Sequence, residues 1–411
     1  MSEIALDIDS VAAGGDGVGR LDDGRVAFVP RTAPGDRARI AIVREHARFV
    51  RGRLLALERA GPGRIDPKCD HYDADRCGGC QLQHLDAATQ RAARRTIVGD
   101  ALRRIGGLEV PDPPLEPALA DWGYRAKITV ARGRGRRFGF HPLDEPRDCF
   151  ALRRCEVADP TLSRAWEALR PVTGMLPSKA ERLVLRLDQE GRVHLVVEDA
   201  TAAAWSRAAE IERVVREAGV ELVVWWRPAG GAPRVLAGRA DAYAPTAFRQ
   251  VNPAMGELVR RAALDALGDP SGRQVWDLYA GVGETSSGLL ARGARVVSVE
   301  RDARAVALAQ TAGGDPIDRR VGEVEAVLDS LPTPDLVVTN PPRAGMARPV
   351  VERLRDSAAE RVVYVSCDPA TLARDLALLT RGGSFRLIRV ASFDLFPQTA
   401  HVESVALVER A

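Results

Sequence analysis

Cys367 lies between a predicted strand and a predicted helix, a position typical of a reactive thiol. It follows an apolar run over residues 361–366, which predicts a strand, and it precedes Asp368 and Pro369, a pair typical of the start of a helix. A thiol just ahead of a helix N-terminus feels the positive end of the helix dipole, so we expect its pKa to be lowered. The pattern therefore predicts a nucleophile rather than an inert core cysteine.

Methylation of a pyrimidine ring at carbon 5 is a reaction that requires such a thiol. Carbon 5 is a poor nucleophile, but a thiolate that adds to carbon 6 gives an enolate with electron density at carbon 5. After methyl transfer, a separate base must remove the carbon 5 proton before the thiolate can leave. We predict that Glu403, just before the last apolar run of the chain, is this base, with His401 as a supporting residue.

Further residues predict a binding site for a nucleoside without phosphates. An apolar run over residues 274–280 leads into Gly281 and Gly283, which let a ligand approach the backbone. The next apolar run ends at Glu300, whose carboxylate suits two ribose hydroxyls. The turn lacks the third glycine of a pyrophosphate site, which favours S-adenosylmethionine over NAD. Asn340, in the turn NPPR, is expected to face the methyl donor and can hydrogen-bond a base edge.

The cysteines predict a metal centre. Cys69, Cys77 and Cys80 fall within twelve residues, and a distant fourth thiolate, from Cys155 or Cys149, completes a set for one zinc ion or one iron–sulfur cluster. A simple zinc ribbon prefers two CxxC pairs, and the single pair here favours iron and sulfur. Unligated buried cysteines are the third interpretation.

The order of apolar runs divides the chain into three expected domains. Residues 1–58 alternate short apolar runs with turns, which is typical of a small OB-type barrel. Residues 59–240 combine the cysteines, a helix over 86–105, several strands and a helix near 201–218. Residues 241–411 alternate strands and helices, and this α/β pattern predicts a parallel sheet covered on both faces.

Composition and charge limit the class of protein. The chain has 411 residues, of which 45% are hydrophobic and 28% charged, which excludes a disordered chain, and no run is long enough for a membrane span. We expect a cytoplasmic monomer with no membrane or protein partner. Net charge is only +3, but residues 121–140 hold six basic residues and one acid among Trp122, Tyr124, Phe138 and Phe140. This mixture suits phosphate contacts and base stacking in RNA, or else a basic hairpin with packed aromatics.

These motifs resemble those of the RNA 5-methyluridine (uracil-5) methyltransferases, in particular the iron–sulfur-containing 23S rRNA type. The resemblance covers essentially the whole chain and rests on SCDP around Cys367, HVES around Glu403, FRQVN over 248–252 and the cysteine pattern. It implies a Rossmann-like S-adenosylmethionine-dependent domain after an N-terminal TRAM barrel and an α+β central domain. It also implies contacts to S-adenosylmethionine from Gln250, Tyr279, Glu284, Glu300 and Asn340, and a 4Fe–4S cluster on Cys69, Cys77, Cys80 and Cys155 rather than Cys149.

The sequence departs from this family at three residues and leaves rival functions open. The family usually has aspartate at the position of Asn340, and commonly asparagine at that of Glu284 and cysteine at that of Ala280. The expected partner is 23S rRNA, with tRNA as the alternative. The rivals are an RNA amino-methyltransferase that uses the NPPR turn, a non-catalytic iron–sulfur RNA-binding protein and a cytosine-5 enzyme.

Overall fold

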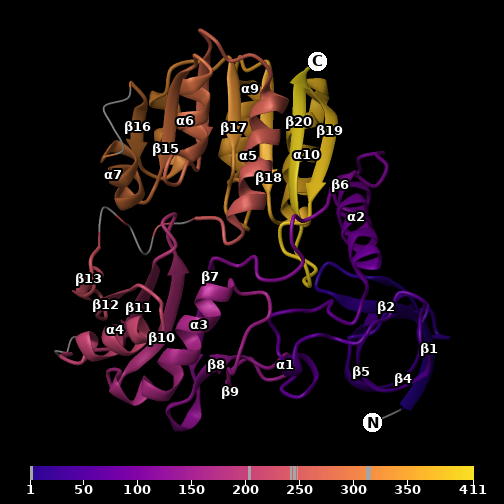
Figure 1. Cartoon of the computed structure of the whole chain (residues 1–411). Helices are drawn as coiled ribbons and strands as arrows, with labels where there is room; N and C mark the ends of the chain where they lie inside the picture. The colour runs from indigo at the N-terminus through magenta and orange to yellow at the C-terminus, as the bar shows by residue number, and fades with distance from the viewer. Residues whose placement is uncertain (1–2, 202–204, 241–242, 244–246, 248, 312–315) are drawn as a thin grey trace.

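The strands of this protein form three separate sheets (Figure 1). The computed structural model describes residues 3–201, 205–240, 243, 247, 249–311 and 316–411, except for the side chain of Arg136. In Figure 1 the barrel lies at the lower right, the central sheet at the lower left and the largest sheet above both. No helix in the described part of the chain has the length and apolar character needed to cross a membrane.

The N-terminal sheet is a closed barrel, as the sequence predicts. Leu6 and Ile8 of its first strand point inward, where they pack with Val29, Ile40 and Val50. The strands pair in the order β1-β2-β3-β5-β4. Their bounds are β1 (Glu3–Val11), β2 (Asp16–Arg20), β3 (Val26–Pro30), β4 (Arg37–Glu45) and β5 (Phe49–Arg59).

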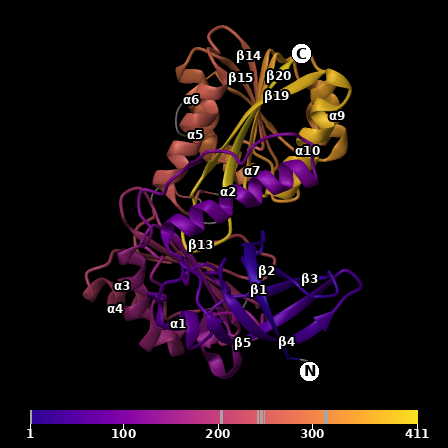
Figure 2. The same ribbon diagram turned by 90° about the vertical axis from the view of Figure 1, so that its right-hand side faces the viewer.

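The cysteine segment leads into a long helix that connects the barrel with the largest sheet. The short helix α1 (Asp70–Asp73) lies among the cysteines, and α2 (Ala87–Arg104) matches the predicted helix. Asp86 caps α2 by accepting a hydrogen bond from the amide of Thr89. The helix contacts β1 on one side and α10 (Pro369–Thr380) on the other, and Figure 2 shows it between the two halves of the molecule.

The central sheet is mostly antiparallel and carries its helices on one face. Trp166, Leu185 and Ile211 are part of the core between the sheet and α3 and α4, and the predicted helix near 201–218 begins at Ala208. Residues 202–204 lie outside the described part, and α3 was not predicted. In spatial order the strands are β13 (Arg234–Ala237), β12 (Leu222–Arg227), β11 (Val193–Asp199), β10 (Ala180–Leu187), β7 (Lys127–Arg132), β8 (Phe138–Phe140) and β9 (Phe150–Ala151), with helices α3 (Pro160–Leu169) and α4 (Ala208–Glu217).

The largest sheet is covered on both faces, as predicted, but it is parallel only in part. Core residues from α9 and α10 pack on one face and those from α5 and α6 on the other (Figure 2). The spatial order of its strands is β16 (Asp318–Val321), β15 (Arg295–Glu300), β14 (Gln274–Leu278), β17 (Leu336–Thr339), β18 (Arg361–Ser366), β20 (Glu403–Arg410), β19 (Phe385–Phe393) and β6 (Leu115–Glu116). The helices are α5 (Pro253–Leu267), α6 (Glu284–Ala291), α7 (Ala303–Thr311), α8 (Val324–Val327) and α9 (Arg348–Asp356).

The last strands correct the expectation of a wholly parallel sheet. The first five strands in the spatial order run parallel, but β20 is antiparallel to β18, and β19 is antiparallel to β20. A parallel connection would need a crossover of a dozen or more residues, usually a helix, whereas only the loop over 394–402 joins β19 to β20. The order of elements is that of an α/β domain in which one strand near the end of the chain, β20, runs against the others.

Candidate active site

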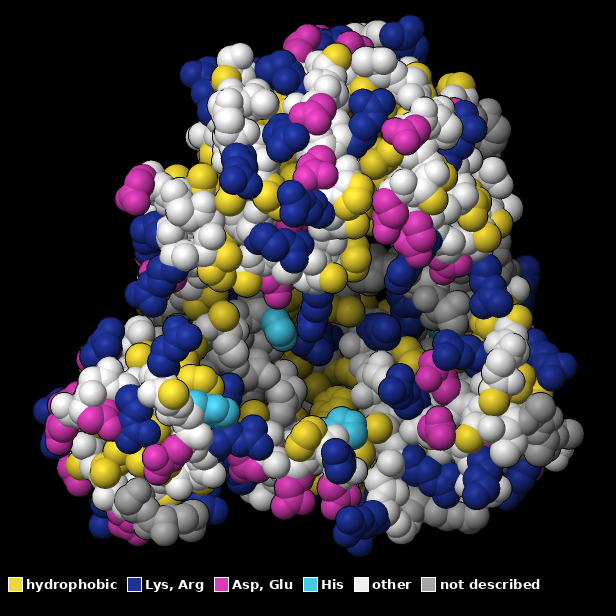
Figure 3. Space-filling view, turned by 180° about the vertical axis from the view of Figure 1, so that it is seen from behind, with side chains coloured by type: hydrophobic (Ala, Val, Ile, Leu, Met, Phe, Trp, Pro, Cys, Tyr) yellow, Lys and Arg dark blue, Asp and Glu magenta, His cyan; other side chains and the backbone are white. Residues whose placement is uncertain are grey.

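A cavity of about 720 Å³ opens at the carboxyl edge of the largest sheet. Figure 3 shows the molecule hollowed between its upper and lower parts, with basic and histidine side chains around the hollow. The parallel strands β14, β15, β17 and β18 all end at this edge, so the residues that follow them converge there. Six of the seven predicted catalytic and cofactor-binding residues line the cavity, namely Cys367, Glu403, Gln250, Tyr279, Glu300 and Asn340.

The reversed strand β20 brings the predicted base to the predicted nucleophile. Ser366 at the end of β18 pairs with Ser404 near the start of β20. The antiparallel register therefore sets Cys367 beside Glu403, which is the first residue of β20. The two side chains are close enough for the carboxylate to raise the pKa of the Cys367 thiol. This arrangement supplies a thiol and a separate base on one cavity wall.

The expectation of a lowered pKa for Cys367 is wrong in the ligand-free protein. The residue does precede α10, whose cap Asp368 accepts a hydrogen bond from the amide of Thr371. Burial and the neighbouring Glu403 nevertheless raise the pKa of the thiol, and Arg343 only partly opposes them. The desolvation of a half-buried thiol and the adjacent carboxylate outweigh the effect of the helix N-terminus.

Glu403 is buried in the sheet edge and has an unusual affinity for protons. Only 2% of its surface is exposed, and burial raises its pKa to about 8 against the opposing effect of Arg343. Burial and the cations Arg343 and Arg125 lower the pKa of His401, so this imidazole is neutral near pH 7. A carboxylate with a raised pKa is a stronger base once it is ionised, as proton removal from carbon requires.

Arg343 is a functional residue that the sequence analysis missed. It ends the NPPR turn, lines the cavity, and interacts electrostatically with Cys367, Glu403 and His401. A guanidinium hydrogen-bonded to the thiol favours the thiolate. The turn was recognised from its prolines, and its last residue was the available signal.

Glu300 lies at the end of the cavity where the sequence predicts a bound nucleoside, which is called the nucleoside end here and includes Tyr279 and Gly281. One carboxylate oxygen accepts a hydrogen bond of 2.9 Å from the amide of Gly281, and the other accepts one of 2.8 Å from the amide of Asp302. These bonds fix the carboxylate against the glycine turn. Tyr279 lies between β14 and that turn with a φ of 62°, a left-handed conformation that is rare for an aromatic residue and directs the chain into the turn.

Glu284 is the predicted residue that does not line this cavity. It lines a neighbouring cavity of about 420 Å³ together with Gln250, which lines both cavities. Its carboxylate pairs with Arg260 at 2.6 Å. Gln250 belongs to the FRQVN motif, whose Phe248 lies outside the described residues. A cofactor contact from Glu284 stays a prediction.

The four predicted cysteine ligands line one cavity of about 540 Å³, and Cys149 does not line it. Burial raises the pKa of Cys77 and Cys80 to about 11 and that of Cys155 to about 12, and the thiols also raise one another's pKa values. Within the described residues, no group of three or more Cys, His, Asp or Glu is placed to hold a metal ion. Four thiols are a donor set that either a zinc ion or an iron–sulfur cluster can take, and the cluster stays a prediction.

Four residues separate the cysteine cavity from the candidate active site. Gly78, Gly79, Arg125 and Val251 line both cavities. The guanidinium of Arg125 lies 5.9 Å from the centre of the Phe396 ring in the active-site cavity and interacts electrostatically with Cys80 and Cys155. A half-buried cation is thus already present beside the thiols, where it would offset the negative charge of a thiolate-bound cluster.

Two aromatic rings of the basic and aromatic segment over 121–140 are packed inside the protein. Tyr124 is buried and donates a hydrogen bond of 2.9 Å to the carbonyl of Pro397, and Phe138 is part of the core of the central sheet. Base stacking is therefore wrong for these two rings, because the chain uses them for packing. Trp122 is half-buried, with the Lys68 ammonium 5.0 Å from its ring centre.

Comparisons with known proteins agree on one chemistry. Residues 319–411 match the tRNA (Uracil-5-)-methyltransferase family, and residues 2–55 match the TRAM domain. The chain is similar to a 23S rRNA (uracil(1939)-C(5))-methyltransferase of Thiobacillus denitrificans, with 33% identity over 98% of this chain and 99% of that protein. It is also 34% identical to an RNA methyltransferase of Thermosynechococcus vestitus, over 98% of this chain and 97% of the other.

A solved structure has the same fold along the whole chain. The tRNA (uracil-54, C5)-methyltransferase of Pyrococcus abyssi, in complex with S-adenosyl-L-homocysteine, superposes with a TM-score of 0.74. The match covers 98% of this chain and 100% of that one, at 24% sequence identity. The similarity therefore extends from the barrel through the central sheet to the largest sheet.

Proposed function

Because this chain belongs to the family of RNA (uracil-5) methyltransferases, we propose that it transfers a methyl group from S-adenosylmethionine to carbon 5 of a uridine through a covalent adduct with Cys367. The observation that carries the covalent mechanism is the placement of Cys367 beside Glu403 on one wall of the cavity. An amino-methyltransferase needs neither a thiol nor a second base at this edge. A binding-only protein has no use for a buried, proton-accepting carboxylate.

The first step is the addition of the Cys367 sulfur to carbon 6 of the uracil. The S–C6 bond forms as the C5–C6 double bond opens toward the C4 carbonyl, which gives an enolate. Arg343 assists because its guanidinium hydrogen-bonds the thiol and favours the thiolate. The target nucleotide must leave its base stack to bring carbon 6 within reach of the sulfur.

The second step moves the methyl group and the third restores the ring. Carbon 5 takes the methyl group from the sulfonium sulfur, and the uracil then carries both a methyl group and a proton on that carbon. Glu403 removes the proton, the electron pair re-forms the C5–C6 double bond, and the S–C6 bond breaks to free Cys367. His401, neutral and on the same wall, supports the base without supplying a charge.

The residues at the nucleoside end are those we propose to hold the methyl donor. Glu300 accepts the ribose hydroxyls with the lone pairs not used by Gly281 and Asp302, and Tyr279 lies beside the adenosine. Gln250 and Asn340 approach from the other sides of the cavity. S-adenosylmethionine supplies the electrophilic methyl group when bound there.

We propose 23S rRNA as the substrate, because the similar protein of Thiobacillus denitrificans is named for that activity and aligns with nearly all of this chain. The similar fold of an enzyme named for tRNA makes tRNA the alternative. The barrel of residues 1–58 and the central domain of residues 59–240 are proposed to bind the RNA around the target that residues 241–411 methylate.

The purified protein is expected to transfer one labelled methyl group to a uridine of unmodified 23S rRNA, which converts that uridine to 5-methyluridine. The test incubates it with labelled S-adenosylmethionine and separate 23S rRNA and tRNA transcripts, followed by nuclease digestion and mass spectrometry of nucleosides. Label in tRNA alone would favour the alternative substrate. Label on an exocyclic amine or at carbon 5 of cytidine would contradict the uracil-5 assignment, and no label in either RNA would favour a binding protein.

The cysteine cavity is proposed to hold a 4Fe–4S cluster on Cys69, Cys77, Cys80 and Cys155. The support is the all-thiol donor set in one cavity and the half-buried cation Arg125 beside it. We assign the cluster a structural role at the RNA-facing side of the protein and no part in methyl transfer.

Replacing Cys77 by serine is expected to remove the iron from protein purified without oxygen. The unchanged chain should contain about four iron atoms and as many labile sulfides, with broad visible absorption. Cys149→Ser is the matched control, because that thiol lies outside the cavity and should leave the iron content unchanged. Zinc in place of iron, or a loss of iron in the control but not in Cys155→Ser, would contradict the proposed ligand set.

A further inference from the structure

The loop from Asp394 to His401 carries two side chains into the active site and leads directly to a third. Phe396 and His401 line the cavity, and two residues after His401 the chain enters β20 at Glu403. The position of this 394–401 loop therefore sets the position of the proposed base. Yet the loop contains no helix or strand, so its shape depends on what holds it from outside.

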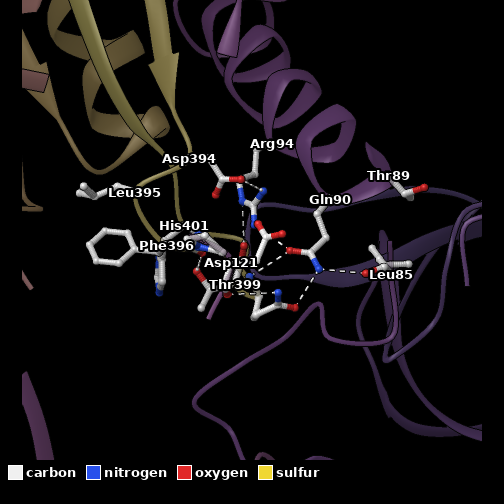
Figure 4. A network of polar contacts seen from close by, with 12 residues as sticks. Leu85, Thr89, Gln90, Arg94, Asp121, Asp394, Leu395, Phe396, Thr399 and His401 are labelled. Atoms are coloured by element: carbon white, nitrogen blue, oxygen red, sulfur yellow. Dashed lines mark hydrogen bonds and ion pairs between the residues drawn. The ribbon is translucent and has the colours of Figure 1, made fainter. Parts of the chain in front are cut away.

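Helix α2 holds the loop through two fully buried polar side chains, which Figure 4 shows pointing from the helix into it. Arg94 is 0% exposed; its Nε donates a hydrogen bond of 3.0 Å to the carbonyl of Thr399, and its Nη1 lies 3.2 Å from the carboxylate of Asp394. The guanidinium thus contacts the loop at its first residue, Asp394, and again near its end, at Thr399. A cation buried at this depth is strongly destabilising without a paired carboxylate and hydrogen bonds. Removing one of these partners would therefore lower the stability of the protein.

Gln90, one helical turn earlier, holds the middle of the loop. Its carboxamide oxygen accepts hydrogen bonds from the amide of Gln398 at 3.0 Å and from Arg94 at 2.9 Å. Its amide nitrogen donates to the side chain of Gln398 and to the carbonyl of Leu85, both at 2.9 Å. All four bonding positions of this buried amide are occupied, which fixes Gln90 and Gln398 relative to each other.

Local hydrogen bonds connect the residues that Arg94 and Gln90 contact with the residues next to the proposed base. Gln398 has a φ of 70°, a left-handed conformation that a non-glycine residue keeps only when its surroundings impose it. The amides of Gln81 and Leu82, just after Cys80, donate to its carbonyl at 3.1 and 3.0 Å. The hydroxyl of Thr399 then accepts a hydrogen bond of 3.2 Å from the amide of His401.

We propose that Arg94 and Gln90 are positioning residues for proton removal: by fixing the 394–401 loop they hold Glu403 at carbon 5 of the methylated uracil. Neither side chain lines the active-site cavity, so neither touches the reacting atoms. The proposal rests on the covalent mechanism proposed above. It predicts that replacing either residue slows only the proton removal by Glu403. Formation of the Cys367 adduct should be spared, because β18 and α10 place the sulfur independently of the loop.

The test compares two reactions of one variant. RNA with 5-fluorouridine at the target site needs only the sulfur and the methyl donor to form a stable adduct, since carbon 5 then has no proton to remove. With Arg94→Met, we expect this adduct to form within about threefold of the unchanged rate, while turnover of ordinary RNA falls on the order of 10²-fold, as misplacement by about an ångström can cause. Methylated RNA should remain bound to the protein through Cys367.

Matched variants separate positioning from a loss of folding. Arg104→Met alters an exposed arginine of the same helix, whose ion pair is with Asp100 of α2, and should leave both reactions unchanged. Arg94→Lys should restore part of the turnover, and the milder Gln90→Met should slow the same step if Arg94→Met does not fold. Adduct formation and turnover that fall together, or turnover that does not fall, would overturn the proposal. Failure of the unchanged protein to form the fluorouridine adduct would instead overturn the proposed function.

Discussion

Replacing Cys367 by alanine is expected to lower methyl transfer to uridine by about 10⁴-fold or more and to abolish the covalent adduct with 5-fluorouridine RNA. Without the sulfur, carbon 5 has no enolate from which to attack the sulfonium, so the loss affects the chemical step itself. Binding of RNA and of S-adenosylmethionine should change by less than about threefold, because Cys367 contributes a single sulfur to a cavity of about 720 Å³.

Three measurements check this prediction: methyl incorporation under single-turnover conditions, a denaturing gel of the adduct, and equilibrium binding of the RNA. Cys149→Ala is the control, because it removes a thiol, in this case a buried one, that lines neither this cavity nor the cysteine cavity. Continued methylation by Cys367→Ala would rule out the covalent mechanism and favour transfer to an amino group through Asn340 and the NPPR turn.

The fold was predictable wherever local pattern decides it. Alternating apolar runs and turns indicate the five strands of the barrel, and repeated strand and helix patterns indicate the parallel strands from β14 to β18. The antiparallel closing pair was not predictable from its apolar runs, because strand direction depends on the connection and not on the side chains. Strand β6 has only two residues and pairs with a strand more than 270 positions later. The sequence around Leu115 has the composition of a hinge, so it did not predict a strand there.

The site was predictable as a set of residues but not as an arrangement. Cys367 and Glu403 were named from their local motifs, whereas their contact depends on the register of Ser366 with Ser404 across two strands. The pKa of the thiol was misjudged because a helix start is visible in sequence and burial is not. Arg343 was missed, although it ends the recognised NPPR turn, because arginine is abundant throughout this chain, with lysine at only three of 59 basic positions, so one more arginine did not stand out.

Replacing Glu403 by glutamine is expected to stop the reaction one step later than the loss of Cys367. The amide has nearly the shape of the carboxylate but cannot accept the carbon 5 proton, so the methyl group is transferred and the S–C6 bond then persists. Multiple turnover should fall by about 10²- to 10⁴-fold, the usual contribution of a positioned base. A single methyl group per protein chain should still be transferred at close to the unchanged rate.

The pH dependence gives this prediction a second readout. Burial raises the pKa of Glu403 to about 8, so the carboxyl is mostly protonated, and inactive as a base, in the free protein at pH 6 and mostly ionised at pH 9. Because Glu403 acts after methyl transfer, its ionisation affects kcat, and the kcat of the unchanged protein should therefore rise with pH up to about 8. The raised pKa of Cys367 acts in the same direction on the earlier addition step.

In Glu403→Gln only the thiol remains to titrate, so single-turnover methyl transfer should keep a shallower rise with pH that reports Cys367 alone. The decisive observation is a covalent complex on a denaturing gel. In it, ordinary uridine-containing RNA has been methylated and is still attached to the variant. A variant that releases 5-methyluridine at the unchanged rate would show that another group removes the proton, and His401 is then the residue to test, because it faces the same cavity.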